Sequence, residues 1–213
     1  MKKIILTVLG AISIACSVAA VGTSEPSSLD PPTSTKQTAV FAGGCFWGVE
    51  AVFEHVKGVI DVKSGYAGGA REKADYETVS TGTTGNAESV MVTFDPTKVT
   101  YTQLLSVFFG VAHDPTQLNM QGPDHGTQYR SAIFYTDSGQ KAQAMAFIDA
   151  INQSKALPKP IVTEVSAFKG FQEAEAYHQN YLARNPNDPY IVVNDLPKLE
   201  DLKVKFPDLY VDR

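Results

Sequence analysis

Cys45 lies among residues that can make a thiol reactive. It follows the glycine pair at 43 and 44 and precedes two aromatic residues, Phe46 and Trp47. The apolar spacing predicts a short strand that ends at the glycines and a helix that begins at the cysteine. Unpaired backbone N–H groups at a helix N-terminus favour negative charge, so we expect this position to lower the pKa of the thiol. The pattern predicts a nucleophilic cysteine.

Three other stretches carry polar side chains that could assist such a cysteine, and one of them, "EAYHQNYL", holds His178 and Tyr181. Glu88 stands at the head of an apolar strand, where a carboxylate is costly unless it is paired or used, and Tyr76 precedes it in a polar segment. Asp124 and Tyr129 lie in the polar stretch "PDHGTQYRS". Together these groups could protonate a substrate oxygen or hydrogen-bond to it.

The aromatic residues after Cys45 predict a pocket. Consecutive helix positions point about 100° apart, so Phe46 and Trp47 do not both enter one core face easily. We therefore expect at least one of the two rings to line an apolar pocket beside the thiol.

Strands and helices alternate along the chain, except that two strands are consecutive in its middle. This order predicts an α+β fold, a two-layer α/β sandwich with a mixed sheet, packed helices and a split βαβ-like core. From residue 186 the chain is punctuated by proline, so we predict a loop-rich C-terminal segment and assign no elements there. The predicted strands are 38–44, 58–69, 87–96, 129–138 and 160–168, and the predicted helices are 45–56, 100–112 (N-cap Thr100), 138–156 and 173–185.

The N-terminus has the order of a secretory signal peptide. Lys2 and Lys3 precede an apolar run, and small residues end at Ala20. We expect a signal peptide (1–20), a disordered linker (21–36) and a catalytic domain (37–213) that is exported, either periplasmic or secreted. The alternatives are an uncleaved anchor and a lipoprotein with its lipid on Cys16. After processing, no membrane span is expected.

The composition and net charge limit the kinds of partner and cofactor that the chain can bind. The chain has 213 residues, a net charge of −5 and 2 cysteines, so the predicted domain holds one thiol and no internal disulfide. A mildly acidic chain is poorly suited to phosphate backbones, which argues against nucleic acid. The 4 histidines show no spacing of a known metal site. We expect a monomer without a metal or a bound cofactor.

Several motifs together closely resemble the A-type peptide methionine sulfoxide reductases. They span about residues 37–210, and the pair "GCFWG" with "DHGTQYRS" is highly specific. The resemblance implies reduction of the S epimer of methionine sulfoxide, free or in oxidised proteins and peptides, as repair of oxidative damage. The motifs are "GCFWGVE", "GYAGG", "TGNAESV", "AHDP", "GPDHGTQYRSAIF", "EAYHQNYL" and "NDLPKLEDLKVKFPDLY".

The resemblance also implies how the catalytic residues act. Cys45 attacks the sulfoxide sulfur and is left as a sulfenic acid. Phe46 and Trp47 hold the methyl group of the substrate. Glu88 donates a proton to the sulfoxide oxygen, for which burial must raise its pKa above the ordinary value of about 4.3.

The remaining residues act on the same oxygen or organise the site. By resemblance, Tyr76 and Tyr129 hydrogen-bond to the sulfoxide oxygen, and Asp124 helps to arrange the site and the later sulfenic acid step. Asn86 stands where a histidine is usual and Ser80 where many members carry a cysteine, and neither change is expected to abolish the chemistry.

The missing resolving cysteine is the departure that matters most. Many members carry further cysteines near the C-terminus, whereas no cysteine follows Cys45 here. The sulfenic acid therefore needs an external reductant, which we expect to be a thioredoxin-like protein or a small thiol.

Two rivals remain open at this point. A papain-like thiol hydrolase would place a histidine about 130 to 150 residues after its cysteine, and His178 fits this spacing. Gly44, Phe46 and Trp47 do not fit that signature, and we expect His178 to pack in the middle of a helix. The other rival is an exported binding module in which the aromatic cleft binds and Cys45 is inert.

Overall fold

The computed structural model describes residues 36–69 and 74–213. The predicted signal peptide, Cys16 and residues 21–35 of the predicted linker lie outside the described residues. Within the described part of the chain, no helix is long and apolar enough to cross a membrane.

A split βαβ unit forms the centre of the fold. Strand β1 (Gln37–Gly43) leads into helix α1 (Phe46–Glu54), which returns the chain to strand β2 (Val59–Ala67). Strand β3 (Ala87–Phe94) lies between β1 and β2 and is antiparallel to both. This arrangement confirms the predicted α+β fold with a split βαβ core.

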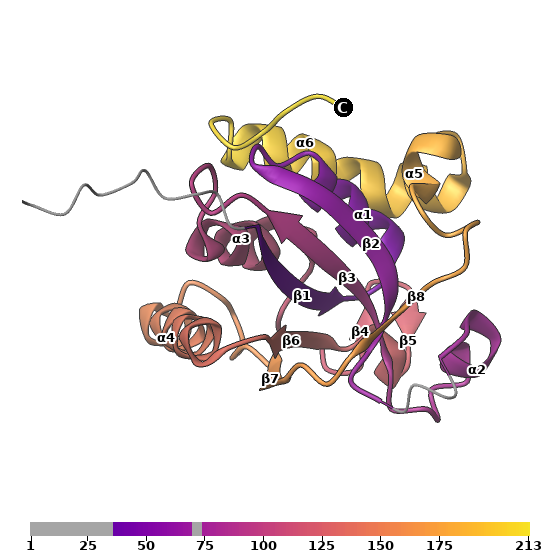
Figure 1. Ribbon diagram of the computed structural model, residues 1–213, viewed down its shortest axis with the longest axis horizontal. Coiled ribbons are helices and arrows are strands. Elements are labelled where there is room, and N and C mark those ends of the chain that lie inside the picture. Colours follow the sequence, from indigo (N-terminus) through magenta and orange to yellow (C-terminus); the bar gives the residue numbers. More distant parts are fainter. Residues whose placement is uncertain (1–35, 70–73) are drawn as a thin grey trace, which may run out of the picture. The chain divides into compact units, whose positions relative to one another are not determined.

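Outer strands complete a mixed sheet in the order β7-β6-β1-β3-β2-β8 (Figure 1). Strand β6 (Ser131–Tyr135) pairs antiparallel with β1, and β7 (Glu164–Ala167) runs parallel to β6. Strand β8 (Phe171–Glu173) pairs with β2. A separate short ribbon joins β4 (Met120–Gln121) to β5 (Asp124–His125).

Helices cover the sheet and place loops at the ends of its strands. Polar side chains cap several of them: Asp75 and Thr100 each form a capping box, and Asp137 caps α4. The helical segments other than α1 are α2 (Tyr76–Ser80), α3 (Tyr101–Val107), η2 (Phe108–Ala112), η3 (Thr127–Tyr129), α4 (Ser138–Ser154), α5 (Tyr181–Arg184), η4 (Ile191–Asp195) and α6 (Leu196–Lys205).

The main core packs α1 against the sheet. Phe41 of β1 stacks on Phe53 of α1 with ring centroids 5.1 Å apart and on Phe108 at 4.8 Å. These rings are fully buried. Because α1 is fixed by this packing, the residue at its N-terminus is held in place.

The predicted helix over 173–185 is wrong in its first half. Only Tyr181–Arg184 is helical, and His178 lies in the turn that precedes it. Asn180 adopts a positive φ of 53°, and the Gln179 side chain bonds to Ser64 N and O of β2. These tertiary contacts override the local helical pattern.

The C-terminal segment has more regular structure than we predicted. Helix α6 (Leu196–Lys205) follows η4 and lies beside α1 (Figure 1). Pro197 falls in the first turn of α6, where a missing N–H costs nothing because no intrahelical partner exists there. Proline therefore marks the start of a helix here, and the prediction of a loop at this position is wrong.

Candidate active site

All the predicted site residues line one cavity of about 330 Å³. They come from segments far apart in the sequence, because the loops that carry them meet at one end of the central strands. Asp188 and Tyr190 complete the lining. The predicted members are Cys45, Phe46, Trp47, Tyr76, Glu88, Asp124 and Tyr129.

Cys45 is the N-cap residue of α1, directly after β1. The tight connection depends on Gly44, which adopts a φ of +90°. A Cβ at Gly44 would also lie 2.5 Å from Cγ of Gln121, so a larger residue would collide with that side chain. The thiol is nearly buried, with the residue 9% exposed.

The expected lowering of the thiol pKa is not found in the resting site. Burial raises the pKa of Cys45 well above its ordinary value, and the negative charges that Glu88 and Asp195 carry when ionised raise it further. The backbone N–H of Trp47, at the helix N-terminus, and the charge of Lys198 both lower the pKa of Cys45. These two effects are smaller than those of burial and negative charge, so the net shift is upward. Cys45 therefore carries its proton in the resting site.

Glu88 is placed to donate a proton into the cavity. It is 2% exposed, and its Oε2 accepts a hydrogen bond from the backbone N–H of Phe46 at 3.1 Å. Burial raises the pKa of Glu88 to about 8, the Phe46 N–H opposes this, and the charge of Asp124 adds to it. The carboxyl group is consequently protonated at neutral pH, as the sequence analysis required.

Two phenol groups lie beside Glu88. Tyr76 begins α2, and its backbone N–H is held by Glu175 Oε1 at 2.9 Å, while Tyr129 ends η3 just before β6. Burial raises the pKa of both phenols, and the negative charge that Glu88 carries when ionised raises it further. Both therefore keep their protons and can act as hydrogen-bond donors.

The aromatic rings next to Cys45 are held by two independent contacts. Trp47 stacks on Tyr181 with ring centroids 3.7 Å apart and planes at 7°. Its indole Nε1–H donates a hydrogen bond to Nδ1 of His178 at 3.0 Å. The His178 ring also lies 4.9 Å from the ring of Phe46. Trp47 is thus fixed in orientation before any ligand arrives.

Sequence reasoning missed Tyr190, Asp188 and the role of His178. Tyr190 donates a hydrogen bond from its hydroxyl to Oδ2 of Asp124, and its backbone N–H is held by Asp188 Oδ1 at 2.8 Å. The signal was present as "NDPY", an acid two residues before a tyrosine, which is typical of a side-chain capped turn. The prolines at 186 and 189 favour the predicted loop-rich segment and hide this turn.

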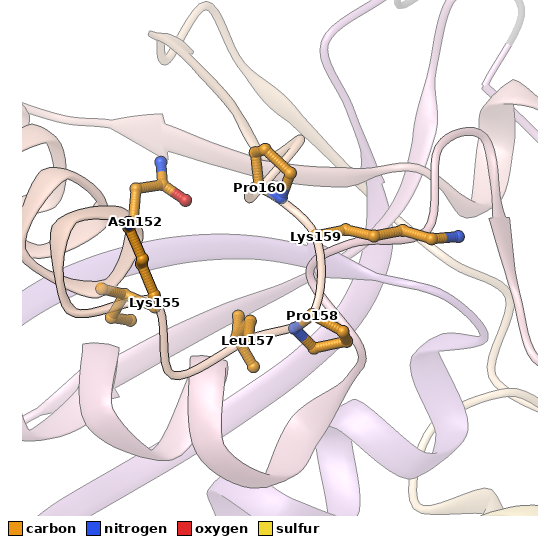
Figure 2. A pocket seen from close by; sticks show the side chains of 7 residues that line it. Asn152, Lys155, Leu157, Pro158, Lys159 and Pro160 are labelled. Atoms are coloured by element: carbon orange, nitrogen blue, oxygen red, sulfur yellow. The ribbon is translucent and has the colours of Figure 1, made fainter.

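A second hollow shows that not every concave surface carries such groups. It has a volume of about 270 Å³ and lies where α4 ends and the chain turns toward β7. In Figure 2, Asn152 and Lys155 of this region lie across from Pro158 and Pro160, and no acid or thiol lines the hollow. Among the described residues, no group of three His, Cys, Asp or Glu side chains is arranged to hold a metal ion.

Comparison with known proteins places the chain in a family. The family model "Peptide methionine sulfoxide reductase" matches residues 37–209. The chain is 59% identical over 177 residues to the peptide methionine sulfoxide reductase MsrA 2 of Mesorhizobium japonicum, covering 83% of this chain and 91% of that protein. It is 51% identical over 168 residues to the MsrA of Nautilia profundicola, covering 78% and 95%.

Solved structures that resemble this fold give the same family assignment. Reduced Mxr1 from Saccharomyces cerevisiae superposes with a TM-score of 0.66 at 34% identity, covering 75% of this chain and 90% of that one. Methionine sulfoxide reductase A of Corynebacterium diphtheriae gives a TM-score of 0.64 at 32% identity, covering 74% and 78%. Neither the thiol hydrolase nor the binding module finds support among these relatives. The chain therefore belongs to the A-type peptide methionine sulfoxide reductases, and it reduces methionine sulfoxide.

Proposed function

We propose that this chain reduces the S epimer of methionine sulfoxide in a cycle that uses one cysteine, with Cys45 regenerated by an external thiol. The observation that carries the proposal is the meeting of Cys45, Glu88 and Trp47 around one cavity. A thiol, a protonated carboxyl group and a fixed aromatic ring are the groups that a methyl sulfoxide needs. Each sulfoxide epimer is reduced by its own enzyme type, and the A-type resemblance assigns the S epimer.

The residue roles follow from the groups that face the cavity. Cys45 Sγ attacks the sulfoxide sulfur, while Glu88 gives a proton to the sulfoxide oxygen. Tyr76 and Tyr129 hydrogen-bond to that oxygen, and Phe46 and Trp47 enclose the methyl group. Asp124 accepts a hydrogen bond from the hydroxyl of Tyr190 and helps to organise the site.

The step balances without an added proton. The oxygen passes from the substrate sulfur to Sγ of Cys45, the thioether leaves, and the thiol becomes a sulfenic acid. The substrate sulfur gains two electrons and the Cys45 sulfur loses two. The thiol gives up one proton and the sulfenic acid carries one, so the number of bound protons does not change. Glu88 is protonated again at the end of the step.

Regeneration requires a reductant from outside the domain. Cys45 is the free cysteine of the described residues, and the other cysteine of the chain is Cys16 in the predicted signal peptide. We propose a thioredoxin-like protein or a small thiol as the reductant. Oxidised proteins and free methionine sulfoxide are both proposed substrates.

We also propose that the protein is exported, to the periplasm or beyond. Support comes from Lys2 and Lys3, the apolar run after them and the small residues before Ala20. The intact mass of the protein isolated from cells tests this proposal. Cleavage after Ala20 supports a soluble exported form, a lipid on Cys16 supports an anchored one, and an unprocessed chain overturns export.

Single-turnover reduction tests the catalytic proposal. The protein is mixed with a peptide that carries the S or the R epimer of methionine sulfoxide, without reductant. We expect about one methionine per protein from the S epimer only, together with a dimedone adduct on Cys45. Cys45→Ser should form none. Methionine formed by Cys45→Ser, or an intramolecular disulfide in the oxidised protein, would overturn the cycle.

A further inference from the structure

A second cavity touches Cys45. It has a volume of about 150 Å³ and shares Cys45, Asp124 and Tyr190 with the first cavity. The rest of its lining differs from that of the first cavity. These further members are Gln121, Gly122, Pro123, Asn194 and Lys198.

Lys198 is the cation of this second cavity, and it is fixed by a buried carboxylate. Its Nζ bonds to Oδ1 of Asp195 at 3.0 Å, with side-chain exposures of 19% for the lysine and 0% for the aspartate. Asp195 is absent from the cavity lining. Lys198 therefore borders the cavity, and its ammonium group is held by a carboxylate that is not part of the lining.

The Asp195–Lys198 pair is built tightly against the helix that carries Cys45. A Cβ at Gly48 would lie 2.0 Å from Oδ1 of Asp195 and 2.8 Å from Nζ of Lys198, so only glycine admits the pair at this position of α1. Oδ2 of Asp195 is buried and finds no hydrogen-bond partner among the described residues. Burying an ion pair in this way costs free energy. A lysine charge held beside the cavity at Cys45 gives the pair a functional reason.

The chemistry of regeneration needs a second approach to Cys45. After the first step the sulfenic acid oxygen lies where the sulfoxide oxygen was, among Glu88, Tyr76 and Tyr129. A thiolate that displaces this oxygen must reach Sγ from a direction away from it. The second cavity offers an approach that does not pass through the Phe46 and Trp47 lining of the first cavity.

We propose that the second cavity is the entry site for the reductant thiolate and that Lys198 binds and stabilises its negative charge. Asp195 is a positioning residue that holds Lys198. A thiolate forms a sulfur–sulfur bond with Cys45, the sulfur–oxygen bond breaks, and the hydroxyl group leaves as water with a proton from Glu88. A second thiol then attacks the mixed disulfide and releases the Cys45 thiol together with the disulfide of the reductant, and Glu88 regains from solvent the proton that the first reductant thiol lost on ionising. This inference rests on the one-cysteine cycle proposed above.

Thiol probes of different charge test the inference. Cys45 is first converted to its sulfenic acid with one equivalent of substrate. Its decay is then followed with 2-mercaptoethanesulfonate (anionic), 2-mercaptoethanol (neutral) and cysteamine (cationic), each rate being divided by the thiolate concentration. The net charge of −5 should by itself disfavour the anionic thiol. We expect instead an advantage of about tenfold for the anionic over the cationic thiolate, because Lys198 focuses the local potential.

Variants on α6 separate this role from a structural one. Lys198→Gln should abolish the preference for the anionic thiolate and keep a burst of about one methionine per protein, although the loss of a charge that lowers the Cys45 pKa should slow that burst. Lys198→Arg should restore the preference. Lys203→Gln, on the same helix but paired with Glu200 at the surface, should behave as wild type. The same variants, measured with a reduced thioredoxin, show whether a protein thiol uses the same entry as small thiols.

The outcomes distinguish the two proposals. If wild type gives no burst, the one-cysteine cycle fails. If Lys198→Gln gives a full burst and keeps the wild-type order of thiol rates, the cycle stands and the entry site is wrong. If Lys198→Gln loses the burst through misfolding, Asp195→Asn/Lys198→Gln replaces it with a neutral pair, and the same loss of preference is required of that variant.

Discussion

Two buried glutamates, Glu88 and Glu50, share one electrostatic property but lie in different surroundings. They are 2% and 1% exposed, and burial raises the pKa of each to about 8. Each accepts a backbone hydrogen bond, Glu88 from Phe46 at 3.1 Å and Glu50 from Asn180 at 2.9 Å. Only Glu88 lines the cavity at Cys45. A raised carboxyl pKa thus reports burial, and a proton donor also needs an adjoining cavity.

A cavity without such groups is equally insufficient. The hollow at the end of α4 (Figure 2) is comparable in volume, about 270 Å³ against about 330 Å³, but its lining is proline, aliphatic, amide and lysine. It holds no nucleophile and no acid. At Cys45 the two conditions are met together, because a thiol and a protonated carboxyl group line one cavity.

Replacing Glu88 should lower the rate of methionine formation more than any of the other substitutions below. It should also show that Glu88 and Glu50 differ in function. Glu88→Gln removes the proton donor but keeps an oxygen that can accept from Phe46 N–H. We expect the single-turnover rate to fall by about 10² to 10⁴. In wild type the same rate should fall as pH rises through about 8, because Glu88 loses its proton there. Rapid-quench measurement of methionine formation across pH tests both statements.

Glu50→Gln is the matched control for this experiment. It removes an equally buried carboxyl group with the same raised pKa, yet it should leave the single-turnover rate and its pH dependence unchanged. Equal losses in both variants would show that buried charge, rather than proton donation into the cavity, governs the rate.

Much of this site could be predicted from the sequence, since its residues fall in short specific motifs. The strand–glycine–helix pattern predicted the position of Cys45 at the start of α1, and the polar residue Glu88 at the head of an apolar strand predicted a carboxyl group that lines the same cavity. The direction of the Cys45 pKa shift could not be predicted, because it depends first on burial and then on the charges of Glu88 and Asp195, and Asp195 approaches α1 from a segment about 150 residues away. A helix N-terminus contributes the same stabilisation in any context, whereas burial and distant charges come from the tertiary fold.

The position of His178 was missed for a related reason. Its local sequence favours a helix, and long-range hydrogen bonds from Gln179 to β2 form a turn instead. In that turn His178 meets Trp47, which lies 131 residues away in sequence. No local pattern encodes such a contact.

His178→Ala should reduce activity less than Glu88→Gln does. It tests the aromatic side of the cavity rather than the acid. The variant removes the acceptor that orients the indole of Trp47, and it leaves Cys45 and Glu88 untouched. We expect KM to rise about three- to tenfold with little change in kcat, as for the loss of one hydrogen bond. Steady-state kinetics with a methionine sulfoxide peptide measures the two constants separately.

His55→Ala serves as the control, because His55 bonds to Ala51 O and stacks on Tyr210, outside the cavity. Its KM should match that of wild type. A fall in kcat with unchanged KM in His178→Ala would mean that the histidine takes part in the chemistry.

Glu50→Gln should have the smallest effect on activity and a measurable effect on stability. Its folded-state pKa of about 8 lies above the ordinary value of 4.5, so the folded state binds the proton more tightly than the unfolded state does. The resulting stability is fully present below about pH 4.5 and is lost as pH rises through about 8. Between about pH 5 and pH 8, the unfolding free energy of wild type should therefore fall more steeply than that of Glu50→Gln, by on the order of 1 kcal/mol per pH unit. Urea unfolding at several pH values measures this difference. Parallel pH dependences in the two proteins would show that Glu50 is ionised in the folded state, and the two buried glutamates would then differ in charge as well as in location.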